Sequence, residues 1–444
     1  MAKVKNSGIE WIGDIPVDWD VKRILYVIEQ PITDGPHTTP DMMDEGIPFV
    51  SAEAVSTGNG SINFDNIWGY ISEEFYKECC KKYIPKKDDI YMIKSGATTG
   101  KVSIVDTDDI FTIWSPLAVI RCDRQSCLPK FMYYSLQADF FQMQVQLGWT
   151  YGTQQNIGMR TLEHLKICVP STTEQQAIAE FLDKRCAEID DVIADIKKQI
   201  ELLQQYKKSL ITETVTKGLD KTVPMKDSGV EWIGKMPEHW KLKHIKYVAE
   251  FINGDRSENY PSGNDMVDEG IIFVTSNNIH GLVLDTSLAN SKYITEEKYK
   301  LLRGAKMQID DIIFCLRGSV GMCAVNKSEN EGTVASSLVV IRTKDIDADY
   351  LNYYLQSQYA LFQTDLYTNG SCAANLSAEN VASYYVLEPK PTEQRNIADF
   401  LEKKCTQIDF IIESKQKQLE TIAEHKKSLI YEYVTGKKRV KEVQ

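Results

Sequence analysis

The chain contains the same unit twice, and this repetition constrains its fold more than any other feature. Residues 7–29 (SGIEWIGDIPVDWDVKRILYVIE) match residues 228–250 (SGVEWIGKMPEHWKLKHIKYVAE) at 13 of 23 positions. A second pair, TEQQAIAEFL at 173–182 and TEQRNIADFL at 392–401, follows at nearly the same spacing. Because both pairs of segments are separated by almost the same number of residues, the chain contains a duplicated unit. Each copy has a divergent first part and a well-matched second part.

The first part of each copy is typical of a mixed α and β domain. Runs rich in β-branched and aromatic residues lie between Gly, Asn and Asp turns, which favours short strands. These runs are Ile47–Val50, Ile90–Ile93 and Leu117–Ile120, and then Ile271–Val274, Ile312–Phe314 and Leu338–Ile341. Segments 129–147 and 348–366, rich in Tyr, Leu, Gln and Phe, are predicted to be amphipathic helices.

The second part of each copy predicts one long helix. Thr173 and Thr392 are expected to cap the two helices, and no Pro or Gly follows until Gly218 and Gly436. Residues of the expected seam recur at gaps of four and three, a period of 3.5 that is typical of coiled coils. The seam residues are Leu182, Cys186, Ile189, Ile193, Ile196, Ile200 and Leu203, and then Leu401, Cys405, Ile408, Ile412, Lys415, Leu419 and Ile422.

The two helices can pair with each other, and we expect an antiparallel coiled coil that joins two pseudo-symmetric α/β domains in an α+β fold. Lys415 replaces Ile196 in the second seam, and one polar seam residue can fix the register of a coiled coil. The alternative is that each helix packs on its own domain or on another protein. The expected boundaries are a first domain at 1–170, a helix at 171–217, a second domain at 218–388, a helix at 389–437 and a basic tail at 438–444.

Several motifs occur in one order in both copies. They are EWIG-x-x-P-x-x-W, a D-D-I block followed by Gly, and P-x-x-T-E-Q-x-x-I-A-x-F-L leading to a helix that ends in K-K-S-L-I-x-E-x-V-T; the first copy also has GTQQNI at 152–157. In this order the chain resembles specificity subunits of type I restriction–modification systems over essentially its full length. The second copy departs from the pattern, with GSCAANL at 370–376.

The resemblance implies a non-catalytic, cytoplasmic subunit for phage defence. Each recognition domain would read one half of a bipartite, asymmetric site in double-stranded DNA, and the helices would set the spacing and bind two methyltransferase subunits. Restriction and translocase subunits would join through that complex. The chain itself would hold no cofactor, because S-adenosylmethionine, ATP and magnesium would belong to the partners.

The residues show no catalytic constellation. The segment GATTGKV at 96–102 has one residue too few, and no Ser or Thr after Lys, for a phosphate-binding loop. No Pro-Pro pair is present, as the methyltransferase tetrapeptide would require, and the six histidines form no close pair of metal-ligand type. We therefore expect no enzyme activity and no metal site in this chain. Nor does the sequence contain a run of apolar residues long enough to span a membrane.

Residues that contact DNA should be polar donors in loops, because base edges and phosphates are read by such groups. In the first domain the candidates are Lys94, Ser95, Thr98, Thr99, Lys101, Gln154, Gln155 and Asn156. In the second they are Arg256, Asn277, Asn278, Arg317 and Ser319. Trp11, Trp19, Trp232 and Trp240 are instead expected to pack at the start of each domain, because they recur in both copies whereas readers should diverge.

The net charge of −12 is unfavourable for binding DNA by bulk electrostatics. Segments 171–217 and 390–444 carry −2 and +3, so the remaining residues carry −13. Either basic side chains gather on one face, or partner subunits supply most phosphate contacts. We expect both, and hence weak DNA binding by the chain alone. A scaffolding adaptor without DNA specificity is the alternative that this charge leaves open.

Overall fold

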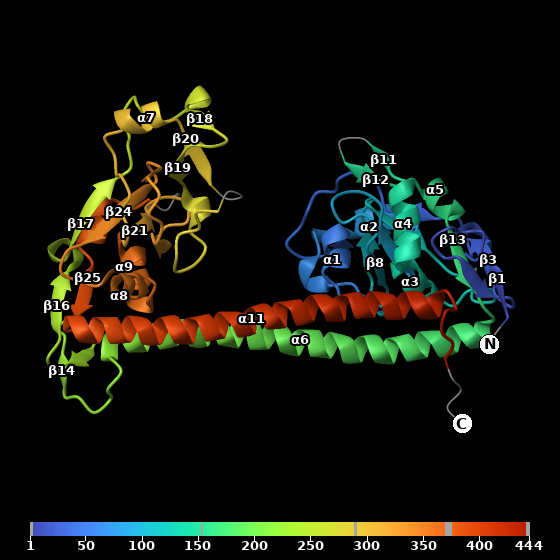
Figure 1. Ribbon diagram of the computed structural model, residues 1–444. Helices are drawn as coiled ribbons and strands as arrows, with labels where there is room; N and C mark the ends of the chain where they lie inside the picture. The colour runs from blue at the N-terminus through green and yellow to red at the C-terminus, as the bar shows by residue number, and fades with distance from the viewer. Residues whose placement is uncertain (1–2, 152–153, 288–290, 369–374, 441–444) are drawn as a thin grey trace. The chain divides into compact units, whose positions relative to one another are not determined.

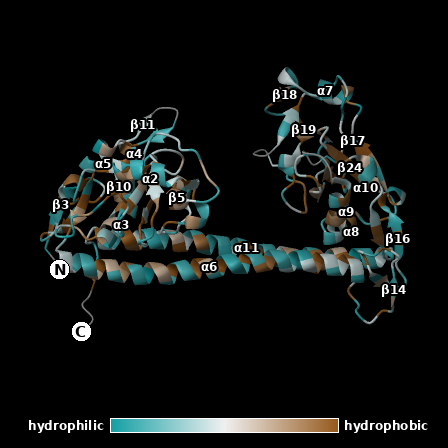
Figure 2. Cartoon of the chain, turned by 180° about the vertical axis from the view of Figure 1, so that it is seen from behind, coloured by the Kyte–Doolittle hydropathy of each residue, from teal (hydrophilic) through white to brown (hydrophobic). Residues whose placement is uncertain are grey.

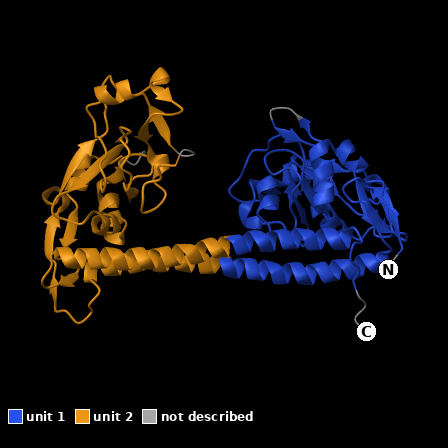
Figure 3. Cartoon of the chain, in the orientation of Figure 1, with its two compact units in different colours: residues 1–196, 417–444 blue, residues 197–416 orange. Residues whose placement is uncertain are grey.

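The computed structural model describes residues 3–151, 154–287, 291–368 and 375–440. The chain divides into two compact units (Figure 3). Unit 1 contains residues 1–196 and 417–444, and unit 2 contains residues 197–416. Each unit combines one mixed α/β part with a stretch of both long helices. The predicted fold class is confirmed.

The long helices are α6 (Thr172–Lys217) and α11 (Pro391–Val434). Gly218 directly follows α6 and Gly436 lies two residues after α11, and both have positive φ angles, 75° and 70°, that suit glycine. The predicted caps are wrong, because Thr173 and Thr392 lie inside the first helical turn. Ser171 provides the cap of α6 instead, since its hydroxyl accepts a hydrogen bond from the backbone N–H of Glu174 at 3.3 Å.

The two helices run antiparallel within each unit. In unit 1, Lys426 bonds to Asp190 at 2.6 Å, and Phe181 packs against Tyr433 with ring centroids 4.5 Å apart. In unit 2, Lys207 bonds to Asp409 at 2.6 Å and Lys415 donates to Gln199 at 2.5 Å. In both units, residues further along α6 contact residues earlier in α11. This order confirms the expected antiparallel pairing.

The predicted seam is the inner face of this pair. All fourteen of its residues are buried or half-buried, whereas most of their neighbours along the helices are exposed. Figure 2 accordingly shows hydrophobic and hydrophilic patches alternating along α6 and α11. Lys207 and Lys426 continue the 4-3 spacing and occupy further polar seam positions.

Among its described residues, the α/β part of unit 1 contains two sheets of three or more strands. The larger has the order β4-β10-β7-β8, and the smaller the order β6-β5-β9, in which β5 and β9 are parallel. Its elements are β1 (Val4–Asn6), β2 (Asp14–Pro16), β3 (Asp20–Arg23), β4 (Thr33–Asp34), β5 (Ile47–Val50), α1 (Ala52–Ser56), β6 (Gly69–Ile71), α2 (Glu73–Cys80), β7 (Ile90–Ile93), β8 (Val102–Ile104), β9 (Thr112–Ile113), β10 (Leu117–Ile120), α3 (Pro129–Gln137), α4 (Asp139–Leu147), β11 (Thr150–Tyr151), β12 (Gln155–Asn156), α5 (Met159–His164) and β13 (Lys166–Val169).

Unit 2 repeats this arrangement with sheets β17-β24-β21-β22 and β18-β20-β19-β23 (Figure 1). Its elements are β14 (Met225–Asp227), β15 (Lys235–Pro237), β16 (Lys241–His244), β17 (Ala249–Asn253), β18 (Met266–Val267), β19 (Ile271–Val274), β20 (Lys292–Ile294), α7 (Glu296–Leu301), β21 (Ile312–Cys315), β22 (Cys323–Val325), β23 (Gly332–Val334), β24 (Leu338–Thr343), α8 (Ala348–Leu355), α9 (Gln358–Thr368), α10 (Ala378–Ala382) and β25 (Tyr385–Glu388).

All six predicted strands are confirmed, and the alternation of their side chains explains how the sheets that contain β7 and β21 are buried on both faces. In β7, Ile90 and Met92 enter one apolar cluster with α3 and α4, while Tyr91 and Ile93 enter another. In β21, Ile312 and Phe314 likewise belong to a different cluster from Ile313 and Cys315.

The helices predicted at 129–147 and 348–366 are each two helices. Segment 129–147 breaks at Ala138, which has extended backbone angles of φ −66° and ψ 143°. Segment 348–366 breaks after Leu355, and α9 begins at Gln358. Neither break contains Pro or Gly, so tertiary packing rather than local propensity ends the first helix in each unit.

The repeated tryptophans pack as predicted. Trp19 and Trp240 are fully buried, and their indole N–H groups donate to Glu174 at 3.0 Å and Glu393 at 3.1 Å. The start of each copy is thereby attached to the first turn of its long helix. Among the described residues, no helix is long and apolar enough to cross a membrane.

Candidate nucleic-acid interface

In unit 1 the structure brings together two predicted segments that are about 60 residues apart. The loop that follows β7 pairs with β12, because Gly96 donates its backbone N–H to the Gln155 carbonyl at 3.0 Å. Ser95 also forms a β-bridge with Asn156, and the hydroxyl of Thr99 lies 3.4 Å from the Gln155 carbonyl oxygen. The candidates of the first domain therefore form one polar surface, which we call the unit 1 loop site (residues 94–101 and 154–156).

The side chains of this site differ in accessibility. Lys101, Gln154, Gln155 and Asn156 are exposed, whereas Ser95, Thr98 and Thr99 are half-buried. The Thr99 hydroxyl is occupied by a hydrogen bond to the Gly96 carbonyl at 2.7 Å. Gly152 and Thr153 of the GTQQNI motif lie outside the described residues.

Lys94 lies at the base of the loop rather than at its tip. Its side chain is 14% exposed and forms an ion pair with Asp34 at 3.1 Å. Asp34 is fully buried and also contacts Lys82 and His37. Burial alone would raise the pKa of Asp34, but hydrogen bonds from Lys82 and Lys94 outweigh it, so the pKa lies below its usual value.

Unit 2 has an equivalent loop site built from other side chains. Arg317 forms a β-bridge with Asn375, and its Nε donates to the Asn375 side chain at 3.2 Å. Because Ser95 pairs with Asn156 in the same way, Arg317 occupies the position of Ser95. Arg317 and Ser319 are both exposed. The unit 2 loop site is thus Arg317, Ser319 and Asn375.

Sequence reasoning missed Asn375, although the repeat provides a signal for it. Aligning GTQQNI with GSCAANL places Asn375 opposite Asn156. The residues opposite Gln154 and Gln155 fall within 369–374, outside the described residues.

The remaining candidates of unit 2 lie on other loops. Arg256 is exposed. Hydrogen bonds at the start of α10 lower the pKa of Glu379, and the nearby charge of Arg256 lowers it further. Asn277 is exposed within the 3-10 turn Ser276–Asn278. Asn278 is fully buried and its amide donates to the Asp285 carbonyl at 2.8 Å, so we withdraw it as a DNA contact.

A buried ion pair fixes the start of the strand that leads into each loop, at the end of the strand away from the loop. In unit 1, Arg121 of the segment after β10 donates to both oxygens of Asp89 at 2.7 Å. In unit 2, Arg342 donates to both oxygens of Asp311 at 2.8 Å. Bidentate pairs of this kind hold both partners in one geometry. Each loop therefore follows a strand whose start is held against the neighbouring strand.

The described residues contain no cluster of His, Cys, Asp and Glu suited to a metal ion. The sites found here are loops of amides, hydroxyls and cations on rigid strands, an arrangement that suits contacts to base edges and phosphates.

Comparison with known proteins decides the family. The family model for the type I restriction modification DNA specificity domain matches the chain twice, at residues 16–202 and 237–421. The chain belongs to this family. One match covers most of each copy of the repeat, which confirms the predicted resemblance and does not favour the scaffolding-adaptor alternative.

Relatives of this specificity-domain family match the chain end to end. It is 27% identical to the putative type I restriction enzyme MjaX specificity subunit of Methanocaldococcus jannaschii over 99% of this chain and 98% of that protein. The MjaVIII specificity subunit of the same organism is 24% identical over 96% and 94%.

Solved structures share the fold. One, from a study of complex assembly and conformational transition of the type I R-M system, has a TM-score of 0.72 at 14% identity and covers 95% of this chain and 99% of its own. The HsdS subunit from Thermoanaerobacter tengcongensis has a TM-score of 0.50 at 14% identity, covering 95% and 98%.

Proposed function

We propose that this chain is the DNA-reading subunit of a type I restriction–modification complex, and that each unit reads one half of a bipartite, asymmetric site. The observation that supports this most is that equivalent loop sites carry different side chains. Ser95 in unit 1 stands where Arg317 stands in unit 2. Two readers with one frame and different contacts read two different half-sites, whereas identical readers would read a palindrome.

The loop sites suggest which contacts read bases. The exposed amides of Gln154, Gln155 and Asn156 suit adenine, which offers one donor and one acceptor in the major groove. Arg317 suits guanine, whose two acceptors match a guanidinium. Lys101 and Arg256 are exposed cations and suit backbone phosphates.

The long helices would hold the readers apart and bind two methyltransferase subunits. Along α6 and α11 the side chains outside the seam are mostly exposed, which leaves an outer face for such partners. Methylation and cleavage would belong to the methyltransferase and restriction subunits, together with S-adenosylmethionine, ATP and magnesium. The complex would act in the cytoplasm, where it meets incoming DNA.

Single-molecule sequencing of adenine methylation tests the proposal. A host expresses this chain with or without its methyltransferase, and we expect a bipartite asymmetric motif only when both are present. Replacing residues 1–170 by those of a relative should change one half of the motif. Arg317→Ala should relax the other half by roughly 5–150-fold at one position, equivalent to about 1–3 kcal/mol.

Two results would reject it. A motif that is unchanged by both alterations would show that this chain does not read DNA. Loss of methylation without any change in the motif of the residual sites would assign the chain a structural role only.

A further inference from the structure

Unit 1 contains a cluster of two lysines and a histidine around one buried carboxylate. Asp34 ends β4 and is fully buried. The Lys94 ammonium lies 3.1 Å from Asp34 Oδ2, and His37 Nε2 lies 3.2 Å from the same oxygen. Lys82 contacts Asp34 Oδ1 and also donates to the Gly35 carbonyl at 3.1 Å.

The geometry of this cluster is fixed by the backbone. Asp34 pairs with Ala118 in the larger sheet. Gly35 packs so closely on the β9–β10 connection that an added Cβ would lie 2.0 Å from the Ile113 carbonyl oxygen, so only glycine fits there. The backbone of Lys94 is held on both sides, because its N–H donates to Pro116 and its carbonyl accepts from Ile157.

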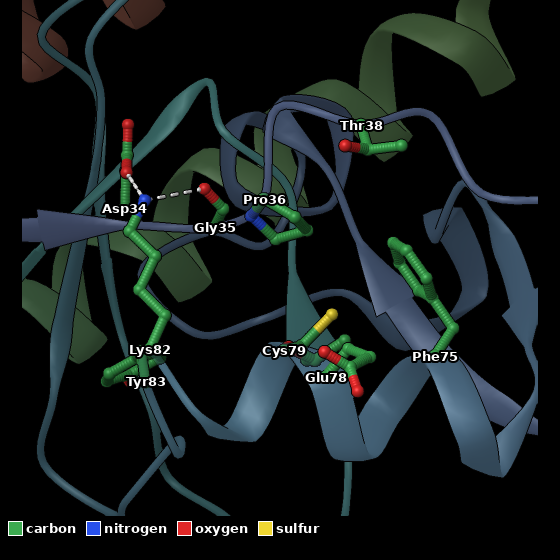
Figure 4. Close-up of a pocket in the computed structure, with 10 residues that line it drawn as sticks. Asp34, Gly35, Pro36, Thr38, Phe75, Glu78, Cys79, Lys82 and Tyr83 are labelled. Carbon is green, nitrogen blue, oxygen red and sulfur yellow. Dashed lines mark hydrogen bonds and ion pairs between the residues drawn. The ribbon is translucent and has the colours of Figure 1, made fainter.

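The outer members of the cluster remain accessible. Lys94 is 14% exposed, but the side chains of Lys82 and His37 are 44% and 70% exposed. Two lysines share one carboxylate, so the cluster carries net positive charge in a chain whose net charge is −12. Lys82 also borders a cavity of about 200 Å³, which includes Thr38 and Phe75 (Figure 4). Glu78 lines this cavity too, but forms an ion pair with Lys81 at 2.5 Å.

We propose that Lys82 and His37 bind a phosphate group of the DNA backbone, with Asp34 and Lys94 as the positioning residues behind them. The inference rests on the proposed function of the chain. The site lies at the base of the unit 1 loop site, because Lys94 is the first residue of that loop. A phosphate held here positions the duplex, while the loop residues beyond it contact bases.

Unit 2 does not contain this cluster at the equivalent place. Asn253 pairs with Val339 as Asp34 pairs with Ala118, so an amide replaces the carboxylate. Leu316 accepts from Leu376 as Lys94 accepts from Ile157, so a buried leucine replaces the lysine. This lysine–carboxylate cluster is therefore a feature of unit 1, and unit 2 would contact phosphates through other cations such as Arg256.

The salt dependence of DNA binding measures this contact. The full chain is assembled with its methyltransferase subunits and titrated, at several chloride concentrations, against a duplex carrying the methylated motif and against a random-sequence duplex. Lys82→Gln removes the charge but keeps a donor for the Gly35 carbonyl. Lys77→Gln is the matched control, because it removes the same charge from an exposed side chain of α2 that does not line the cavity.

Each phosphate contact contributes about −0.9 to the slope of log K against log salt. We expect Lys82→Gln to reduce the magnitude of this slope by about 1 and to weaken binding equally on both duplexes. Lys77→Gln should leave the slope unchanged. His37→Ala, in an exposed loop, should weaken binding to both duplexes without lowering the thermal midpoint. A wild-type slope for Lys82→Gln would overturn the proposal.

Two further results separate the possible explanations. Inorganic phosphate added at constant ionic strength should compete no better than chloride. If phosphate competes with the wild-type complex but not with Lys82→Gln, and the slope is unchanged, the site binds free phosphate and the DNA assignment is wrong. If the wild-type complex does not prefer the motif, the proposed function fails, while the slope on the random duplex still tests the phosphate contact.

Discussion

The two units share their sheets and buried ion pairs but differ in the exposed residues of their loops. In both, an aspartate before the central strand receives two hydrogen bonds from an arginine at the end of the neighbouring strand, Asp89 from Arg121 and Asp311 from Arg342. The loops that follow differ at nearly every polar position. The comparison shows that buried polar interactions keep the duplicated frame constant, because an unpaired buried charge is costly, whereas exposed loop residues are free to diverge.

The units also differ in how they use a carboxylate beside the sheet. Unit 1 neutralises Asp34 with lysine side chains, which leaves cations facing solvent. Unit 2 satisfies Asp255 with backbone N–H groups, from Ser257 and Arg303 at 2.7 Å each. Only the first arrangement provides charge for a partner. The second is a structural anchor, and this difference leads to predictions that can break or sharpen the comparison.

The largest effect is expected from removing the shared aspartate. Asp89→Ala should lower the free energy of unfolding by about 3–5 kcal/mol, because it leaves Arg121 without its partner in a largely buried site. Asp311→Ala should cost about 1 kcal/mol less, since Asp89 also receives a hydrogen bond from Tyr83. Urea denaturation of the full chain measures both values.

Arg124→Ala is the matched control for the unit 1 pair. Arg124 binds Asp88 at the surface, with its side chain 65% exposed, and its loss should cost less than about 1 kcal/mol. Equal losses for Asp89→Ala and Arg124→Ala would show that the buried pair does not maintain the frame.

The second prediction concerns the acid stability of unit 2. Hydrogen bonds from Ser257, together with the backbone N–H of Arg303, lower the pKa of Asp255 to about 2 against the opposing effect of burial. Since the pKa is lower in the folded state than the usual value near 3.9, the stabilisation is present above about pH 4 and is lost as the pH falls through 2. Asp255→Asn should therefore unfold with a weaker dependence on pH between 4 and 2, with a difference of about 2 kcal/mol at neutral pH. If the free energy of unfolding falls equally with pH in the wild-type chain and in Asp255→Asn between pH 4 and 2, Asp255 does not have a lowered pKa in the folded state.

The periodicity and spacing of residues in the sequence predicted the six strands and the seam of the long helices. The strands were predictable because β-branched runs such as Ile47–Val50 are bounded by turn residues, and the seam because its period of 3.5 has a single structural meaning. The breaks within 129–147 and 348–366 were not, because no Pro or Gly marks them and packing alone ends those helices.

The candidate site was predictable only in part. Repeat alignment placed the two loops correctly, but it gave no information on where side chains point. Lys94 turns inward because Asp34, 60 residues earlier, lies beneath it, and Asn278 is buried because its amide closes a turn. Such long-range partners depend on the folded sheet and leave no local pattern in the sequence.

The third prediction compares the two charged seam pairs, which the repeat makes equivalent. Asp190 is 29% exposed beside Lys426, whereas Asp409 is 52% exposed beside Lys207. Lys426→Met should cost about 1 kcal/mol, because it leaves the less exposed carboxylate unpaired, and Lys207→Met about half as much. Thermal unfolding of the two variants measures the difference. A larger loss from Lys207→Met would show that solvent exposure does not decide the value of these pairs.

The smallest effect is expected where the two seams differ. Ile196 is 8% exposed, while its counterpart Lys415 is half-buried and donates to Gln199 at 2.5 Å. Lys415→Ile should raise the free energy of unfolding by about 0.5–1 kcal/mol, because the gain from apolar burial exceeds the loss of one exposed hydrogen bond. Gln199→Ala is the control, since it removes the same hydrogen bond without filling the seam, and should change stability by less than about 0.5 kcal/mol. If Lys415→Ile instead destabilises the chain, the lysine is required at this position. Lys415 then fixes the register in which α6 and α11 pair.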